Sequence, residues 1–230
     1  MKARLERPGV IYVVVEQLRV PVLCLVLPLA FAGTSRWWNV WLLAGAMQLL
    51  TTAHLLVLLR WNPALLNARG SRHEGSKKLD RLFLAGFGAL GTATPAVAAL
   101  DAGAVGWTGS IRSIVTGLAL LLTGYAGSTW AMAINRHFER TVRIQDDRDH
   151  RVIRDGPYRY VRHPGYAAAV FLFCALPPLL GSVWAALPVA ALTLVLVART
   201  AFEDRTLQHE LRGYEDYARQ TRYRLLPGVW

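Results

Sequence analysis

Two short polar runs in the last third of the chain contain residue types from which a ligand site can be built. The first, GPYRYVRHPGY at residues 156–166, combines arginine, histidine and tyrosine. The second, RTAFEDRTL at residues 199–207, contains the adjacent carboxylates Glu203 and Asp204. Arginine binds carboxylate groups, whereas carboxylates bind amines and hydroxyls. If the two runs meet in space, they would suit a small zwitterionic ligand.

Long apolar segments surround these runs. The 230 residues are 53% hydrophobic and 18% charged, against roughly 45–50% and about 25% in ordinary soluble domains. The apolar residues form five blocks, at 10–33, 37–59, 82–105, 114–134 and 166–198. Four blocks have the length of about 20 residues that one membrane-spanning helix needs. We therefore predict an all-α, polytopic integral membrane bundle with four single spans.

The fifth block is too long for one crossing and contains Pro177-Pro178 near its middle. Proline interrupts helices, so we predict a membrane helical hairpin over 165–199, with arms at about 165–180 and 183–199. A single kinked helix is the alternative. A hairpin returns the chain to the face from which it started, and it would bring Arg162 and His163 close to Glu203 and Asp204.

Positive charge is concentrated in the segments that such a topology places on one side. Of the 26 Lys and Arg residues, three precede the first block, six lie between the second and third, eight between the fourth and fifth, and six in the tail. An excess of Lys and Arg marks the cytoplasmic side. The N-terminus, the large loops and the tail are therefore expected to be cytoplasmic. The net charge of +11 thus reflects topology, and no nucleic-acid binding is predicted.

The polar segments divide the chain into two predicted parts. Residues 1–134 form a four-span scaffold with a cytoplasmic loop at 61–81, which contains a short helix and a turn. Residues 135–230 contain the site: a charged segment with a turn at residues 155–157, the hairpin, and a tail helix at 201–220 that Gly213 weakens or divides. Cys24 and Cys174 fall in apolar blocks, and neither a disulfide nor a metal site is expected.

Glu16 and Arg19 lie three residues apart in the first block. Charged side chains in a bilayer are expensive and often functional. Alternatively, residues 5–19 lie along the membrane interface and the crossing starts near Val20, and we favour this second interpretation.

The run HRVIRDGPYRYVRHPGY, followed by an apolar hairpin, EDRTL and GYEDY, resembles the isoprenylcysteine carboxyl methyltransferase and phospholipid methyltransferase superfamily, and its bacterial branch in particular. The resemblance covers residues 135–230. Members carry H-x-hydrophobic-hydrophobic-x-x-G-x-Y-x-x-x-R-H-P-x-Y and a later E-E-x-x-L. The residues that match the first motif are His150, Gly156, Tyr158, Arg162, His163, Pro164 and Tyr166.

The resemblance implies S-adenosylmethionine as cofactor and a lipophilic acceptor that enters from the bilayer. It implies that Arg162 and His163 hold the methionine part of the cofactor, and that Glu203, with Asp204, holds its amino or ribose end. Tyr158 and Tyr166 would wall the pocket. The remaining matched residues complete the expected cofactor site: His150, Gly156 and Pro164. Arg162, His163 and Glu203 are the expected catalytic residues.

Two positions depart from the family pattern. The acidic pair is Glu203-Asp204 instead of two glutamates, so the second carboxylate reaches one methylene less. Ala168 stands where many members have glycine, and close backbone approach is less assured there.

Other functions and acceptors remain open from the sequence. A membrane reductase that uses NADPH shares a similar R-H-P-x-Y region, and a non-enzymatic protein could bind anionic lipid headgroups through its arginines. The compatible acceptors are a prenylated cysteine carboxylate, a phospholipid amine and a small lipophilic thiol or acid. In a bacterial inner membrane, which the branch resemblance suggests, the small molecule is favoured. The sequence predicts no oligomeric state.

Overall fold

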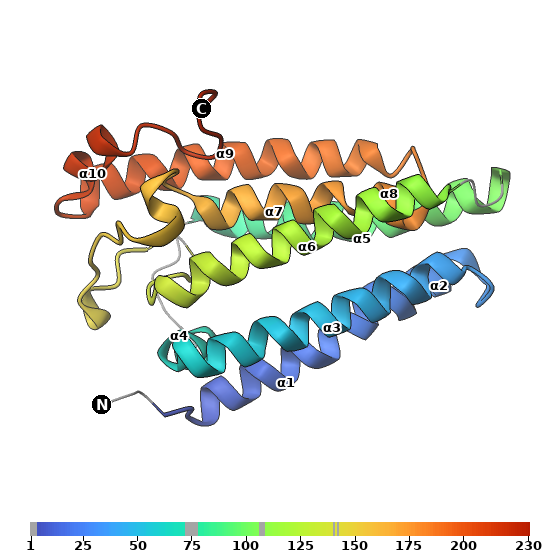
Figure 1. The fold of residues 1–230 in the computed structure, drawn as a ribbon, viewed down its shortest axis with the longest axis horizontal. Coiled ribbons are helices and arrows are strands. Elements are labelled where there is room, and N and C mark those ends of the chain that lie inside the picture. Colours follow the sequence, from blue (N-terminus) through green and yellow to red (C-terminus); the bar gives the residue numbers. More distant parts are fainter. Residues whose placement is uncertain (1–3, 72–77, 106–108, 140, 142) are drawn as a thin grey trace.

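The protein is a bundle of long helices that run side by side (Figure 1). The computed structural model describes residues 4–71, 78–105, 109–139, 141 and 143–230. Five of its helical stretches are long and apolar enough to cross a membrane: 7–32, 38–61, 79–102, 111–134 and 186–210. They comprise α1 (Arg7–Pro21) continued by α2 (Leu27–Ala32), α3 (Trp38–Trp61), α5 (Lys78–Val105), α6 (Ile111–Ile134) and α9 (Ala186–Glu210).

Large apolar side chains on these helices point outward. Leu49, Leu100, Leu122 and Leu194 are each more than half exposed, which water would penalise but lipid tails accept. The predicted all-α membrane bundle is thereby confirmed, and the protein is an integral membrane protein.

The first apolar block forms one helix. Residues 7–32 run without interruption through a π-helical turn at Val22–Val26, so the change of direction that we expected near Val20 does not occur. Glu16 is buried, and its carboxylate pairs with Arg19 one turn later. The connection after α3 contains the predicted short helix, α4 (Pro63–Gly70), and its predicted turn falls on residues outside the described part.

The predicted hairpin is present, with different bounds. Its first arm is α7 (Pro164–Cys174) and α8 (Leu176–Leu180), which end at Gly181 with φ of 71°. Its second arm does not end at residue 199, because α9 continues to Glu210 and includes the first half of the expected tail helix. After Pro188 the sequence has neither proline nor glycine until Gly213, whose φ of 81° separates α9 from α10 (Tyr214–Gln220).

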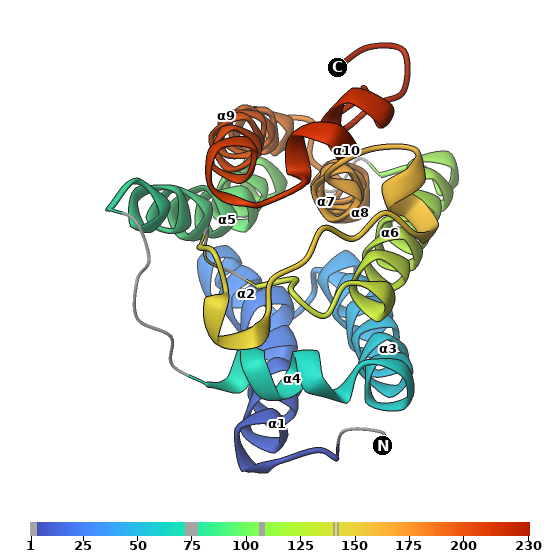
Figure 2. The same ribbon diagram turned by 90° about the vertical axis from the view of Figure 1, so that its left-hand side faces the viewer.

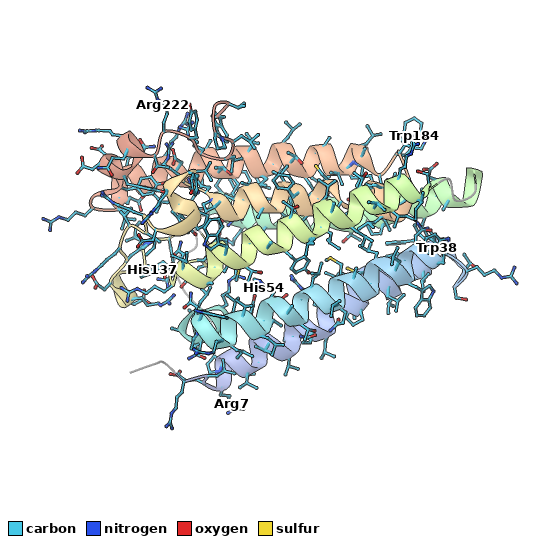
Figure 3. The ribbon with its side chains drawn as sticks, viewed as in Figure 1. Arg7, Trp38, His54, His137, Trp184 and Arg222 are labelled. Carbon is cyan, nitrogen blue, oxygen red and sulfur yellow. The ribbon has the colours of Figure 1, made fainter. Side chains whose placement is uncertain are left out.

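The functional motifs gather at one end of the bundle. Arg7, His137 and Arg222 lie at this end, and Trp38 and Trp184 lie at the opposite end (Figure 3). The end-on view shows α4, α10 and the segment between α6 and α7 lying across the ends of the long helices (Figure 2). We call this the motif end. The fold thus brings the two polar runs to the same end, as the hairpin topology predicts.

Candidate active site

A cavity that is partly open to solvent lies at the motif end. It is enclosed by the segment that follows α6, by the start of α7, by the last turns of α9 and by α10. Seven of the nine predicted cofactor-site residues line it: His150, Tyr158, Arg162, His163, Pro164, Tyr166 and Glu203. The other two, Gly156 and Asp204, lie outside its lining.

Asp204 is fully buried and is the centre of a group of donors that we call the Asp204 cluster. Arg162 binds it through two nitrogens, with Nε 2.7 Å from Oδ1 and Nη2 2.8 Å from Oδ2. The cluster also includes Arg224 Nε at 2.8 Å, Gln208 Nε2 at 2.8 Å, the Tyr214 hydroxyl at 2.9 Å and His163 Nε2 at 3.1 Å. Its carboxylate oxygens are therefore occupied by protein donors.

The R-H-P run is also fixed by the chain after α10. Arg162 Nη1 donates to the carbonyl oxygens of Thr221 and Arg222 at 2.8 and 2.7 Å. The backbone N–H groups of Arg162 and His163 donate to the carbonyls of Tyr223 and Arg224, each at 2.9 Å. Two side-chain and two backbone attachments thus hold this run against the tail.

Glu203, one residue before Asp204, is in a different environment. It is partly exposed and lines the cavity. The Tyr166 hydroxyl donates to its Oε2 at 2.5 Å. The Tyr166 ring stacks on the His163 ring, with centroids 5.8 Å apart and planes 12° apart. One wall of the cavity therefore combines two stacked rings with a carboxylate.

Tyr166 is itself held from behind by a buried ion pair. Arg199 Nε donates to the Tyr166 hydroxyl at 2.9 Å, and Arg199 Nη2 lies 2.8 Å from Asp80 Oδ1. Both side chains of this pair are buried. Asp80 belongs to the first turn of α5, so the scaffold helices contribute to this wall.

Tyr158 is positioned by the turn that precedes the R-H-P run. Gly156 has φ of 59°, and a Cβ there would come within 2.2 Å of Ile134 Cδ1, so only glycine fits. The Tyr158 hydroxyl accepts from Asn135 Nδ2 at 2.9 Å, and its carbonyl accepts from the Tyr217 hydroxyl at 2.8 Å. Burial raises the pKa of Tyr158, which therefore stays a neutral phenol. The turn lies where the sequence predicts it, and Tyr158 is one of the residues that line the cavity.

The segment between α6 and the turn forms the opposite wall. The rings of His137 and His150 lie 4.6 Å apart, and Gln145 Nε2 donates to the His137 carbonyl at 2.7 Å. Burial and the neighbouring His137, Arg143 and Arg148 lower the pKa of His150 to about 4. Burial also lowers the pKa of His137. Both imidazoles are therefore neutral near pH 7.

Close packing between α6 and α7 sets the depth of the site. A Cβ on Gly124 would lie 3.0 Å from the Ala168 carbonyl, and one on Gly127 would lie 3.2 Å from the Ala168 Cβ. The backbones of α6 and α7 therefore approach closely at Ala168, and the glycines that allow it are on α6 and not at position 168. Similarly, a Cβ on Gly165 would lie 2.3 Å from the Phe138 ring, so this phenyl ring packs directly on the R-H-P-G-Y run.

Several lining residues were not predicted from the sequence. Tyr214 and Tyr217 were not among the predicted site residues, yet their hydroxyls donate to Asp204 and to the Tyr158 carbonyl. Other unpredicted lining residues are Asn135, His137, Phe138, Glu139, Arg143, Gln145, Leu207 and Leu211. The run NRHFER, which directly follows the fourth apolar block, was the available signal for four of them. Within the described residues, no group of three or more His, Cys, Asp or Glu side chains could hold a metal ion.

Residues 117–209 match the sequence model of the Isoprenylcysteine carboxyl methyltransferase (ICMT) family. The match covers less than half of the chain, and over this part the chain is similar to the ICMT family. The matched region contains the cavity's R-H-P-G-Y wall and both carboxylates of α9. The ICMT family uses S-adenosylmethionine, the cofactor that the sequence resemblance implied.

The chain is also similar to a solved structure. The structure of the eukaryotic intramembrane Ras methyltransferase ICMT shares 18% sequence identity with this chain, over 88% of this chain and 71% of that one, with a TM-score of 0.49. A comparison with curated proteins gave no match.

Proposed function

We propose that this ICMT-family methyltransferase transfers the methyl group of S-adenosylmethionine to a lipophilic acceptor at the cytoplasmic face of a bacterial inner membrane. The observation that carries the proposal is the cavity between the R-H-P-G-Y run and Glu203. It lies at the open end of the hairpin, opposite its turn, and on this proposal a water-soluble donor and a lipid-soluble acceptor meet there.

The cavity suits such a donor in its chemistry. Its lining includes the apolar side chains Val152, Ile153, Leu207 and Leu211 for a planar base. It also includes a carboxylate, Glu203, for an amine or ribose hydroxyls, and the faces of tyrosine and histidine rings, which favour a neighbouring cation. The residues present therefore fit the cofactor.

Each predicted residue has a proposed role on this basis. His163 and Tyr166 present stacked rings and Glu203 a carboxylate, all at one wall. Tyr158 and His150 close the sides. Pro164 starts α7 and directs these rings toward the cavity.

Arg162 and Asp204 receive a different proposed role from the one that the resemblance implies. Four N–H groups of Arg162 are used by Asp204 and by two carbonyls of the tail. Asp204 in turn is occupied by its donors. We assign both to positioning: they hold His163 and the R-H-P run in place, and Glu203 makes the carboxylate contact with the donor.

Bound S-adenosylmethionine supplies an electrophilic methyl group on a positively charged sulfur. The protein then needs to bind both reactants, orient them and exclude water. The ring walls and the apolar lining exclude water, and the hydrogen bond from Tyr166 fixes the orientation of Glu203.

The acceptor that we propose is a small lipophilic carboxylate, thiol or amine. The apolar side chains exposed on the bundle indicate that the helices lie in lipid, from which a lipophilic acceptor would enter. The motif end carries the basic residues that mark a cytoplasmic face. A fluorescent-protein fusion at the tail, expressed in bacteria, tests this orientation, because the reporter should fluoresce only when the tail is cytoplasmic.

Calorimetric titration of the purified protein tests the donor. We expect S-adenosylhomocysteine to bind with a dissociation constant near the micromolar range and NADPH to give no binding heat. Glu203→Gln should weaken the binding of S-adenosylhomocysteine roughly tenfold. If folded wild-type protein does not bind S-adenosylhomocysteine, the proposal is wrong.

Transfer of a radioactive methyl group to candidate acceptors in liposomes tests the second substrate. Lipophilic acids, thiols and amines of equal chain length form one series, and a prenylated cysteine forms the comparison. Labelling of the prenylated cysteine alone would contradict the proposed small-molecule acceptor.

A further inference from the structure

Asp80 is a fully buried carboxylate that lies more than one hundred residues before the acidic pair of α9. Its Oδ1 lies 2.8 Å from Arg199 Nη2. Neither of its oxygens accepts a hydrogen bond of good geometry from the described residues. A charged side chain is tolerated in the protein interior when an opposite charge pairs with it. The role of Asp80 is therefore to compensate the charge of Arg199.

Arg199 uses this compensation to hold Tyr166. Its Nε donates to the Tyr166 hydroxyl at 2.9 Å. Its guanidinium also lies over the rings of Phe87 and Tyr166, 5.8 and 5.9 Å from their centroids. A cation over aromatic faces in a buried setting is well fixed. The Arg199 head group is therefore held on the side of Tyr166 that faces α5.

The Tyr166 hydroxyl transmits this orientation to Glu203. A phenol has one proton to donate. Because its oxygen already accepts from Arg199, the proton is directed to the other side, toward Glu203 Oε2 at 2.5 Å. The result is a directed series from Asp80 through Arg199 and Tyr166 to the carboxylate at the cavity wall.

Arg199 and Glu203 are also four residues apart on α9, the spacing at which oppositely charged side chains of a helix pair directly. In the structure Arg199 faces Asp80 instead. Without the Asp80 charge, Glu203 would become the nearest counter-ion along the helix and would turn away from the cavity.

We infer that Asp80 and Arg199 are positioning residues of the methyltransferase: Asp80 keeps Arg199 from capturing Glu203, and Arg199 orients Tyr166 so that the Glu203 carboxylate remains available to the donor's amine or hydroxyl groups. This inference rests on the proposed function of Glu203. It assigns the first turn of α5, outside the sequence motifs, a part in donor binding.

Binding of S-adenosylhomocysteine to purified full-length protein, measured by calorimetry together with thermal unfolding, tests the inference. Asp80→Asn should weaken binding roughly tenfold, because the resulting Arg199–Glu203 pair competes with the ligand. The double variant Asp80→Asn/Arg199→Gln should bind more tightly than Asp80→Asn, because it removes the competing charge. A purely structural role of Asp80 predicts no such recovery.

Asp101→Asn is the matched control. It makes the same change in the same helix at the opposite end of the bundle, where Asp101 Oδ2 accepts from the Ser182 hydroxyl at 2.6 Å. Its unfolding temperature should fall while its affinity for S-adenosylhomocysteine stays at the wild-type value.

The outcomes separate the inference from the function on which it rests. No binding by folded wild-type protein would contradict the proposed function. Wild-type binding that Glu203→Gln weakens, with folded Asp80→Asn binding as tightly as wild type, would overturn the inference alone. If Asp80→Asn does not fold, Arg199→Lys decides, because it keeps the charge opposite Asp80 and loses the Nε donor to Tyr166. Wild-type affinity in folded Arg199→Lys would overturn the inference, and a several-fold loss would support it.

Discussion

The two adjacent carboxylates of α9 belong to differently organised regions. Asp204 is fully buried and accepts hydrogen bonds from five side chains of the R-H-P run, α9, α10 and the tail. Glu203 is partly exposed at the cavity wall and accepts from Tyr166. A helix turns by about 100° per residue, so neighbouring side chains face different surroundings. An acidic pair in a sequence therefore need not act as a pair.

This difference assigns stability to one region and ligand binding to the other. In the Asp204 cluster, charge and hydrogen bonds are satisfied within the protein. Around Glu203, the supporting contacts come from behind, through Tyr166 and Arg199, and leave the cavity side for a ligand. Substitutions in the two regions should therefore separate unfolding temperature from donor affinity.

The largest effect is expected from Asp204→Asn. This change leaves Arg162 and Arg224 without their buried counter-charge, which typically costs about 3–5 kcal/mol. We expect a much lower unfolding temperature and no measurable binding of S-adenosylhomocysteine. Thermal unfolding in detergent checks the first, and calorimetry the second. The comparison would break if Asp204→Asn and Glu203→Gln had the same unfolding temperature.

Gly165→Ala sharpens the comparison without changing either carboxylate. The added methyl group would meet the Phe138 ring at 2.3 Å, and overpacking of this kind costs about 1–3 kcal/mol. Because Phe138 lines the cavity, we expect weaker donor binding as well as a lower unfolding temperature. Gly88→Ala is the control, since a Cβ there has no neighbour within 4 Å. Equal unfolding temperatures and equal donor affinities in the two variants would contradict the close packing of Phe138 on Gly165.

Two tyrosine-to-phenylalanine changes test the regions with the same chemistry. Tyr214→Phe removes one of several donors to Asp204, and Tyr166→Phe removes the donor to Glu203. Each hydrogen bond is worth about 1 kcal/mol. We expect Tyr214→Phe to lower the unfolding temperature at nearly unchanged affinity, and Tyr166→Phe to weaken donor binding several-fold. The reverse pattern, read by calorimetry and thermal unfolding, would refute the division.

The smallest effect is expected from pH. Folding lowers the pKa of His150 from 6.5 to about 4, so the unfolded chain binds more protons between these values. The contribution of His150 to stability is therefore complete above pH 6.5 and is lost as pH falls to about 4. Unfolding temperatures measured from pH 7 to pH 4 should fall less steeply in His150→Gln. An identical slope would show that His150 is not buried in this way.

The sequence predicts the architecture well because lipid imposes simple rules. Apolar blocks of about 20 residues identify the spans, and α7 starts at Pro164, one residue before the predicted start of the hairpin's first arm. The hairpin's second arm was predicted too short, because the end of an apolar block does not end a helix. α9 continues into polar residues since nothing between Pro188 and Gly213 interrupts it.

The sequence predicted which residues belong to the candidate site better than it predicted the contacts between them. The motif and the hairpin place His163 and Glu203 at one cavity, as the structure does. The pairing of Arg162 with Asp204, and of Asp80 with Arg199, depends on how separate helices pack. Such contacts have no local signature. Tyr214 and Tyr217 are an example: they are the same residue type and their rings pack together, yet their hydroxyls have different partners. Residue type alone therefore does not predict these contacts.

The length of α9 has a consequence for the choice of membrane. Its 25 residues span about 37 Å at 1.5 Å per residue, whereas a typical hydrocarbon core is about 30 Å thick. One continuous helix therefore connects the hairpin turn to the acidic pair and exceeds the hydrocarbon core by about one turn. Hydrophobic mismatch changes the tilt of such a helix. We therefore expect lipid acyl-chain length to change the depth of Glu203 relative to the headgroups, which would make bilayer thickness a physical variable of the candidate site.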